Sequence, residues 1–372
     1  MRATWPDDRF IAIHALALQK WTGQPHPAFG FSGPNPREVK IMKHGYSKFA
    51  LSLTLCLFMG AVSAWPQTGA AQSFAPAAPA PTTNPLKIAL LHWYKADLAT
   101  SFAVGSQPYG VAFDGANIWT ANFGDGTVSK IQANDGTVLG TFKVGFQPIG
   151  VTFDGANIWV SDNATNEVIK LRASDGTVLG TFSVGNNSSS TPFWMTFDGA
   201  NIWVPYGNNS LAKLRASDGK TLGTFAVGNS PVAAAFDGSN VWVTNYGDGT
   251  VSKLRATDGK VLGTFAVGFN PLGIAFDGAN MWIANRGGTV SKLRASDGTT
   301  LGTFTIGGEP YGIAFDGTNI WVGGAPQVDE LRASDGAILA VFKIQGTNVT
   351  GVAFDGANVW ISGLNDNKLY KF

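Results

Sequence analysis

The chain has 372 residues, of which only 14% are charged, and it contains 47 glycines and 12 tryptophans. This composition excludes an intrinsically disordered chain, which needs high charge and few aromatic residues, and it suits a tightly turned β protein. From residue 65 onward there are 19 basic and 22 acidic residues, so a net charge of −3 gives no electrostatic basis for binding nucleic acid or an anionic membrane.

The first 85 residues differ in composition from the rest. Residues 42–64, MKHGYSKFALSLTLCLFMGAVSA, place two lysines before a short apolar run that ends in small residues. This is the layout of a secretory signal peptide, and its apolar core is too short to span a bilayer securely. We therefore interpret residues 1–41 as a misassigned upstream extension. The alternative is a cytoplasmic extension followed by an anchor helix.

Residues 65–85 are rich in Ala, Pro and Thr and indicate a flexible linker before a domain at 86–372. The only cysteine, Cys56, lies inside the signal peptide. We expect a secreted, periplasmic or cell-surface monomer without disulfides and without membrane insertion after cleavage.

The triplet FDG recurs seven times, starting at Phe113, Phe153, Phe197, Phe236, Phe276, Phe315 and Phe354. The spacings of 39 to 44 residues, with short strands and Gly-containing turns between, are typical of β-propeller blades. In the first copy we expect strand a at PYGVAF, strand b at IWTAN, strand c at TVSKIQA and strand d at VLGTFKV. Asp-Gly turns join the strands because glycine tolerates positive φ.

The last copy has no strand d, since the sequence ends at Phe372 after strand c. Residues 98–105, LATSFAVG, match the strand d sequence VLGTFAVG at 261–268. We therefore predict an all-β fold, a seven-bladed β-propeller of four-stranded blades in which an N-terminal strand completes the last blade and removes an open edge.

The seven FDG repeats can be read as a ring of acidic ligands or as a structural unit. We favour the structural unit: the Asp forms the turn, and Trp119, Trp159, Trp203, Trp242, Trp282, Trp321 and Trp360 are wedges between blades. The repeated Lys-Leu-Arg of strand c can be a basic belt for polyanions. We favour a solvated outer strand in which Arg pairs with the Asp of the following turn.

The pattern P-x-G-[IV]-A-F-D-G-x-N-[IVM]-W-[VI]-[AST] resembles the repeat of NHL and YVTN propellers over about residues 107–372. It is also similar to the repeat of streptogramin (virginiamycin B) lyases. The resemblance to the lyases implies a histidine base and a metal held by acidic groups on one loop face. This sequence departs from that pattern, because three of its four histidines precede residue 65 and only His92 remains.

Chemistry-bearing motifs are scarce in the repeats. The GDGT strings at 124–127 and 247–250 offer too few carboxylates for calcium, and no phosphate-binding or nucleophile motif occurs. We expect no metal, no cofactor and no catalytic residue. The variable d–a and b–c loops are the candidate binding face.

Trp194 stands where other copies have glycine on strand a, next to the axis, so it either plugs the channel or lines a pocket at its mouth. The candidate ligand-binding residues on the loop face are Trp194, Phe193, Tyr109, Tyr311, Gln107, Gln147, Glu309, Arg286, Tyr206 and Tyr246, together with the 186–191 loop.

These residues favour a secreted, non-catalytic binding or interaction propeller for a glycan, peptide or protein ligand, and a surface-layer role is close to this. The alternative is a streptogramin-lyase-like enzyme without the family histidine. Such an enzyme needs a convergent set such as Glu309, Arg286 and a tyrosine.

Overall fold

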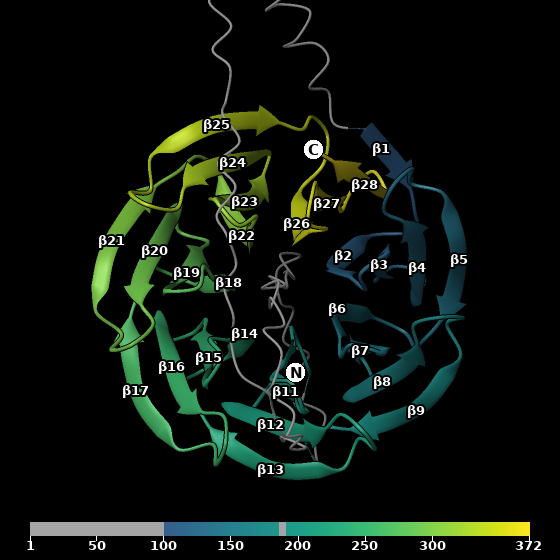
Figure 1. Cartoon of the computed structure of the whole chain (residues 1–372), viewed down its shortest axis with the longest axis horizontal. Coiled ribbons are helices and arrows are strands. Elements are labelled where there is room, and N and C mark those ends of the chain that lie inside the picture. Colours follow the sequence, from purple (N-terminus) through teal and green to yellow (C-terminus); the bar gives the residue numbers. More distant parts are fainter. Residues whose placement is uncertain (1–99, 186–190) are drawn as a thin grey trace, which may run out of the picture. The chain divides into compact units, whose positions relative to one another are not determined.

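Seven four-stranded antiparallel sheets stand around a central axis in the computed structural model, which describes residues 100–185 and 191–372 (Figure 1). The predicted extension, signal peptide and linker lie outside the described residues. In the part of the chain that is described there are no helices, and hence none that could cross a membrane. The predicted seven-bladed propeller is confirmed.

Each blade runs from the axis outward in chain order. Blade one has β2 (Pro108–Phe113), β3 (Asn117–Asn122), β4 (Thr127–Gln132) and β5 (Val138–Lys143). Blade two has β6 (Pro148–Phe153), β7 (Asn157–Asp162), β8 (Glu167–Arg172) and β9 (Val178–Ser183). Blade three has β10 (Thr196–Phe197), β11 (Asn201–Tyr206), β12 (Ser210–Arg215) and β13 (Thr221–Ala226). Blade four has β14 (Pro231–Phe236), β15 (Asn240–Asn245), β16 (Thr250–Arg255) and β17 (Val261–Ala266).

Blade five has β18 (Pro271–Phe276), β19 (Asn280–Asn285), β20 (Thr289–Arg294) and β21 (Thr300–Thr305). Blade six has β22 (Glu309–Phe315), β23 (Asn319–Ala325), β24 (Gln327–Arg332) and β25 (Ile338–Lys343). Blade seven has β26 (Val349–Phe354), β27 (Val359–Gly363) and β28 (Lys368–Lys371), and its outer strand is β1 (Thr100–Ala103).

The closing strand β1 pairs antiparallel with β28, from Thr100 opposite Lys371 to Ala103 opposite Lys368. Its Phe102 ring lies 5.4 Å from the Trp360 ring, and the strand d phenylalanine of every other blade packs on its own tryptophan in the same way. The N-terminal strand therefore completes blade seven in both hydrogen bonding and packing.

The FDG turn is a structural unit, as predicted. Asp114 Oδ1 accepts hydrogen bonds from the backbone N–H groups of Ala116 and Asn117, and Gly115 has φ of 100°. The other carboxylate oxygen accepts the indole N–H of Trp119 at 2.8 Å. All seven blades repeat this Asp–Trp bond at 2.7–2.8 Å. The buried indole thereby has the partner that a buried donor requires.

The strand c lysines are not solvated, so our expectation of a solvated strand was wrong for them. Strand c is the third strand, and strand d covers it. Each ammonium lies 4.8–5.2 Å from the centre of the facing Trp ring and donates to backbone carbonyls of the next blade. Lys253 Nζ, for example, donates to Ala295 O at 2.6 Å and Ser296 O at 3.0 Å. The six lysines are Lys130, Lys170, Lys213, Lys253, Lys292 and Lys371.

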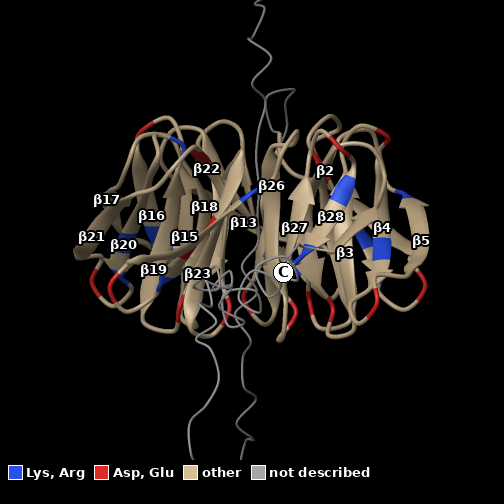
Figure 2. Cartoon of the chain, turned by 90° about the horizontal axis from the view of Figure 1, so that it is seen from above, with Lys and Arg blue, Asp and Glu red and all other residues tan. Residues whose placement is uncertain are grey.

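The arginines of the same strands do behave as predicted. Five of them form exposed ion pairs of 2.8–3.0 Å with the Asp three residues later, as in Arg255 with Asp258. Figure 2 shows the resulting distribution, with basic residues on the strands and acidic residues concentrated at the turns along both edges. Within the blades that the structure describes, no basic belt is formed.

Small residues at the axis allow neighbouring inner strands to approach closely. A Cβ on Gly273 would lie 2.6 Å from the Tyr311 carbonyl oxygen, and one on Gly150 would lie 2.7 Å from that of Phe193. Such contacts are too short for any side chain, so glycine is required at these positions.

Candidate functional site

The d–a and b–c loops form one face of the propeller, here called the loop face. Aspartates of the b–c loops fix the d–a loops by accepting backbone N–H groups: Asp125 binds Ser106 N at 2.8 Å, and Asp248 binds Asn229 N at 2.6 Å. These two carboxylates belong to the GDGT strings, so they serve as loop anchors. Among residues 100–185 and 191–372, no group of three or more metal-ligating side chains occurs.

Five of the ten candidate residues lie in one cluster around the axis. Tyr109, Trp194 and Tyr311 are buried members of it, and Phe193 and Tyr246 pack against them. The cluster also contains the inner-strand residues Ile149, Val232 and Leu272. The position that follows the strand a proline therefore contributes to the same cluster from several blades.

An ion pair borders this cluster. Arg286 Nε donates to Glu309 Oε2 at 2.9 Å, and the Tyr311 hydroxyl donates to the same oxygen at 3.3 Å. The Arg286 guanidinium also lies 5.7 Å from the centre of the Tyr311 ring. The arginine side chain is mostly covered, while that of Glu309 is 51% exposed. The carboxylate is thus held in a fixed place and still faces solvent.

Neighbouring charges and burial shift the pKa values of two side chains in this network. Burial alone would lower the pKa of Arg286, but the hydrogen bond to Glu309, together with Tyr311 and Tyr246, raises it above its usual value. Burial, and then the charge of Tyr311, raises the pKa of Tyr109 well above its ordinary value. Arg286 therefore stays cationic and Tyr109 stays neutral across the physiological range.

Trp194 is fully buried. It forms a parallel bridge with Ala233: its N–H donates to Val232 O and its carbonyl accepts from Ala234 N, both at 3.0 Å. The inner strand β10 is only two residues long, which leaves room for a large side chain where blade four has Ala233 and the other five blades have glycine. The indole Nε1 is buried and has no hydrogen-bond partner among the described residues. Burial fits a plug of the channel, and ligand contact by Trp194 stays a prediction.

The remaining candidates are not all brought together. Gln107 and Gln147 lie in d–a loops, where their backbone carbonyls accept from Phe123 N and Asn163 N. Tyr206 is buried in a separate cluster between blades two and three. Residues 186–190 of the predicted loop lie outside the described residues.

Sequence reasoning missed three loop residues. Asn270 donates to the Tyr246 hydroxyl at 2.9 Å and so extends the network. Phe146 and Phe269 are 72% and 74% exposed at the tips of two d–a loops. The signal was present, because the d–a loops after blades one and four read GFQP and GFNP, where the loop after blade three reads GNSP.

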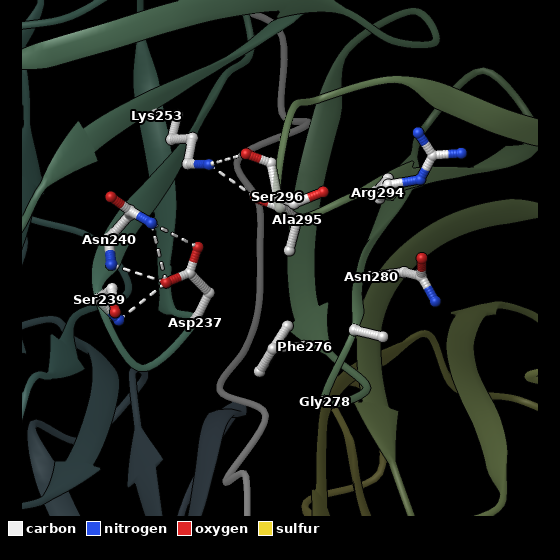
Figure 3. Close-up of a pocket in the computed structure, with 11 residues that line it drawn as sticks. Asp237, Ser239, Asn240, Lys253, Phe276, Gly278, Asn280, Arg294, Ala295 and Ser296 are labelled. Carbon is white, nitrogen blue, oxygen red and sulfur yellow. Dashed lines mark hydrogen bonds between the residues drawn. The ribbon is translucent and has the colours of Figure 1, made fainter.

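A cavity of about 580 Å³ lies on the opposite face, between blades four and five (Figure 3). Its walls include Asp237, Lys253 and Arg294. The Lys253 ammonium is engaged by two carbonyls, and Asp237 accepts from Asn240 and Trp242. Because its main polar groups are occupied by the blade contacts seen elsewhere in the ring, we regard it as a gap between blades and place the candidate site on the loop face.

These features define a seven-bladed β-propeller with a polar and aromatic cluster at the axis of its loop face. A family model described as outer membrane protein assembly factor BamB matches residues 124–273. A search of the curated proteins by sequence returns no match.

Two solved structures have a similar fold. One is a catalytically inactive virginiamycin B lyase from Staphylococcus aureus with quinupristin, with a TM-score of 0.64 and 21% identity. The other is the selenomethionine-substituted lyase, with a TM-score of 0.64 and 20% identity. Each match covers 73% of this chain and 98% of the lyase. The predicted resemblance to streptogramin lyases is thus confirmed for the fold.

Proposed function

We propose that the protein is a binding propeller that recognises a polar ligand on its loop face, over the axis. The axis cluster is defined as Tyr109, Trp194, Tyr246, Arg286, Glu309 and Tyr311. The observation that carries this proposal is the Arg286–Glu309 pair at 2.9 Å, held beside aromatic side chains with the carboxylate half exposed. Preorganised polar groups beside aromatic surface are the usual content of a ligand site.

The chemistry of the axis cluster favours a glycan or a peptide. The exposed carboxylate accepts hydroxyl or amide N–H groups, and the partly buried rings of Tyr246 and Phe193 supply apolar surface. The positive charge of Arg286 is offset by Glu309, so the site offers no excess charge for a polyanion. Phe146 and Phe269, exposed on the same face, favour additional contact with a protein or peptide.

A glycan and peptide array, followed by melting curves with each hit, tests this proposal. We expect a hit that raises the melting temperature, and we expect Glu309→Gln to reduce its affinity by about tenfold or more, the loss of a charge-assisted hydrogen bond. Glu167→Gln makes the same change on another blade and should leave affinity unchanged. An array without hits, or equal losses in both variants, would contradict ligand binding at the axis cluster.

One observation supports a lyase-like alternative. The enzyme hypothesis requires Glu309, Arg286 and a tyrosine to converge, and the Glu309 carboxylate is within hydrogen-bond distance of both Arg286 and Tyr311. Quinupristin, bound in the similar lyase structure, is the substrate to test. Its conversion, followed by liquid chromatography and lost in Glu309→Gln, would favour the enzyme, whereas an unchanged chromatogram would contradict it for this substrate.

We also propose export of the mature chain, on the basis of the signal-like residues 42–64. N-terminal sequencing of the protein from the host's extracytoplasmic fraction should find a start at or near Trp65. A chain that retains residue 1 in the cytoplasm would contradict this. A single monomer-sized peak in size-exclusion chromatography is expected.

A further inference from the structure

The contact between one blade and the next is here called a seam. Six of the seams are built from the same set of side-chain and backbone contacts. The strand c lysine of one blade lies over its own Trp ring and donates to carbonyls in the c–d turn of the next blade. The glycine of that turn packs on the strand d phenylalanine of the first blade, as Gly298 does on Phe265. Each seam therefore needs a cation from one side and a covering turn from the other.

The seam between blades six and seven is built differently. Glu330 stands opposite Trp321, at the register position that lysine occupies in the other six blades. Trp321 is only partly buried, while the other six seam tryptophans are fully buried. Phe372 lies 5.2 Å from Phe342 and 6.0 Å from Trp321. This seam thus offers a carboxylate and an aromatic face instead of an ammonium.

Topology indicates which segment corresponds to the covering turn of the other seams. In the other blades the covering turn is the segment immediately before strand d. In blade seven strand d is β1, so the corresponding segment is the one that precedes Thr100. Lys371 pairs with Thr100 as Lys130 pairs with Gly140. Ala133, which accepts from Lys371, lies seven residues before Gly140, and the residue seven before Thr100 is Trp93.

We propose that residues 93–99 dock onto the seam between blades six and seven, with the Lys95 ammonium paired with Glu330 over Trp321. The polarity of the seam is inverted: blade six supplies the anion, and the incoming segment supplies the cation. Charge complementarity supports the choice of residue, because Lys95 is the basic side chain nearest to β1 in the preceding sequence. Next to Trp321 the ammonium would also gain a cation–π contact.

The surroundings of the Glu330 carboxylate favour a cation beside it. Its Oε1 accepts from Asn319 Nδ2 at 2.7 Å, and Asp316, with which Trp321 bonds, lies close enough to add negative charge. Burial, and then the charge of Asp316, raises the pKa of Glu330. A half-buried carboxylate beside another carboxylate is stabilised by a neighbouring cation.

A double-mutant cycle on the full chain tests the pair. Lys95→Ala and Glu330→Gln should each lower the melting temperature by about 1–3 °C, and the double variant should fall no further than either one. Lys87→Ala, in the same segment but eight residues earlier, is the matched control and should not change the melting temperature.

The charge-swapped chain, Glu330→Lys with Lys95→Glu, provides a second measurement that does not depend on truncation. It should recover most of the stability that either reversal alone loses. Additive losses in the cycle, a silent Lys95→Ala, or a Glu330→Gln variant more stable than the parent would each overturn the pairing. Loss of ligand binding at the loop face is not expected in any of these variants.

Discussion

Trp194→Ala decides whether the axial tryptophan is a plug or a binding surface. The side chain is fully buried among residues of several blades, and truncating such a tryptophan costs about 3–5 kcal/mol of unfolding free energy. Its indole N–H is buried and has no partner within residues 100–185 and 191–372, and removing an unsatisfied donor returns roughly 1 kcal/mol. We therefore expect a net loss of about 2–4 kcal/mol, which lowers the melting temperature by about 4–8 °C.

Thermal unfolding followed by tryptophan fluorescence or calorimetry measures this loss. Trp194→Phe is the matched control: it keeps an aromatic ring and deletes the unpartnered N–H, so it should cost less than half as much as the alanine variant. A Trp194→Ala protein that melts within 1 °C of the parent and no longer binds its ligand would refute the plug and favour a pocket wall. Equal melting losses in both variants would refute the reasoning about the indole N–H.

Three further predictions concern other parts of the ring. Lys253→Met leaves two buried carbonyls without a donor and should lower the melting temperature by about 2–6 °C, whereas Arg255→Met, which breaks an exposed ion pair, should change it by less than 2 °C. The pKa of Tyr109 is higher in the folded state than in the unfolded state, so its contribution to stability is complete below about pH 10 and is lost as pH rises further; melting curves from pH 8 to 11 should fall less steeply in Tyr109→Phe. Phe269→Ser should leave the melting temperature within about 1 °C of the parent, because the ring is exposed, while weakening any ligand that reaches the loop tips.

The sequence predicts the fold well because the turns and strands of each repeat are determined by short local sequence motifs. Asp-Gly fixes the hairpins, and Pro108–Phe113 is both the expected and the observed inner strand of blade one. The missing strand d of the last copy has one matching segment, so the closing strand β1 follows from counting alone. Repetition removes the ambiguity that a single short strand would have.

The environment of the strand c lysines could not be predicted in the same way. Lys253 and Arg255 lie two residues apart on the same side of strand β16, and both look like solvated charges in the sequence. Lys253 stands opposite Trp242 in the middle of the sheet, while Arg255 stands opposite Asn240 at the strand end. Their position along the strand decides their burial. The carbonyl groups that accept from Lys253 belong to the next blade, so the repeat alone does not reveal them.

The candidate site was predicted in part. Arg286, Glu309 and Tyr311 are adjacent because the b–c loop of blade five, which holds Arg286, lies beside the start of β22 in blade six, and blade order predicts that neighbourhood. Tyr206, another of the predicted site residues, is buried at the end of β11 in the packing between blades two and three, and ligand contact by it stays a prediction. The direction in which a loop side chain points depends on the conformation of its own turn, and the repeat pattern does not predict that conformation.

The departures from the repeat can be interpreted by asking which contact of the regular unit is absent at each place. Trp194 replaces a glycine where the inner strand β10 is too short to crowd its neighbour, so the volume is available. Glu330 replaces a lysine at the one seam among the described blades where the strand d of the next blade, β1, is not joined to its strand c by a c–d turn. In both places the contact that requires the repeat residue is absent, and the substituted side chain fits the local surroundings. The Arg286–Glu309 pair is not part of the repeated lysine–carbonyl contact and its carboxylate faces solvent, and this is why we propose ligand recognition there.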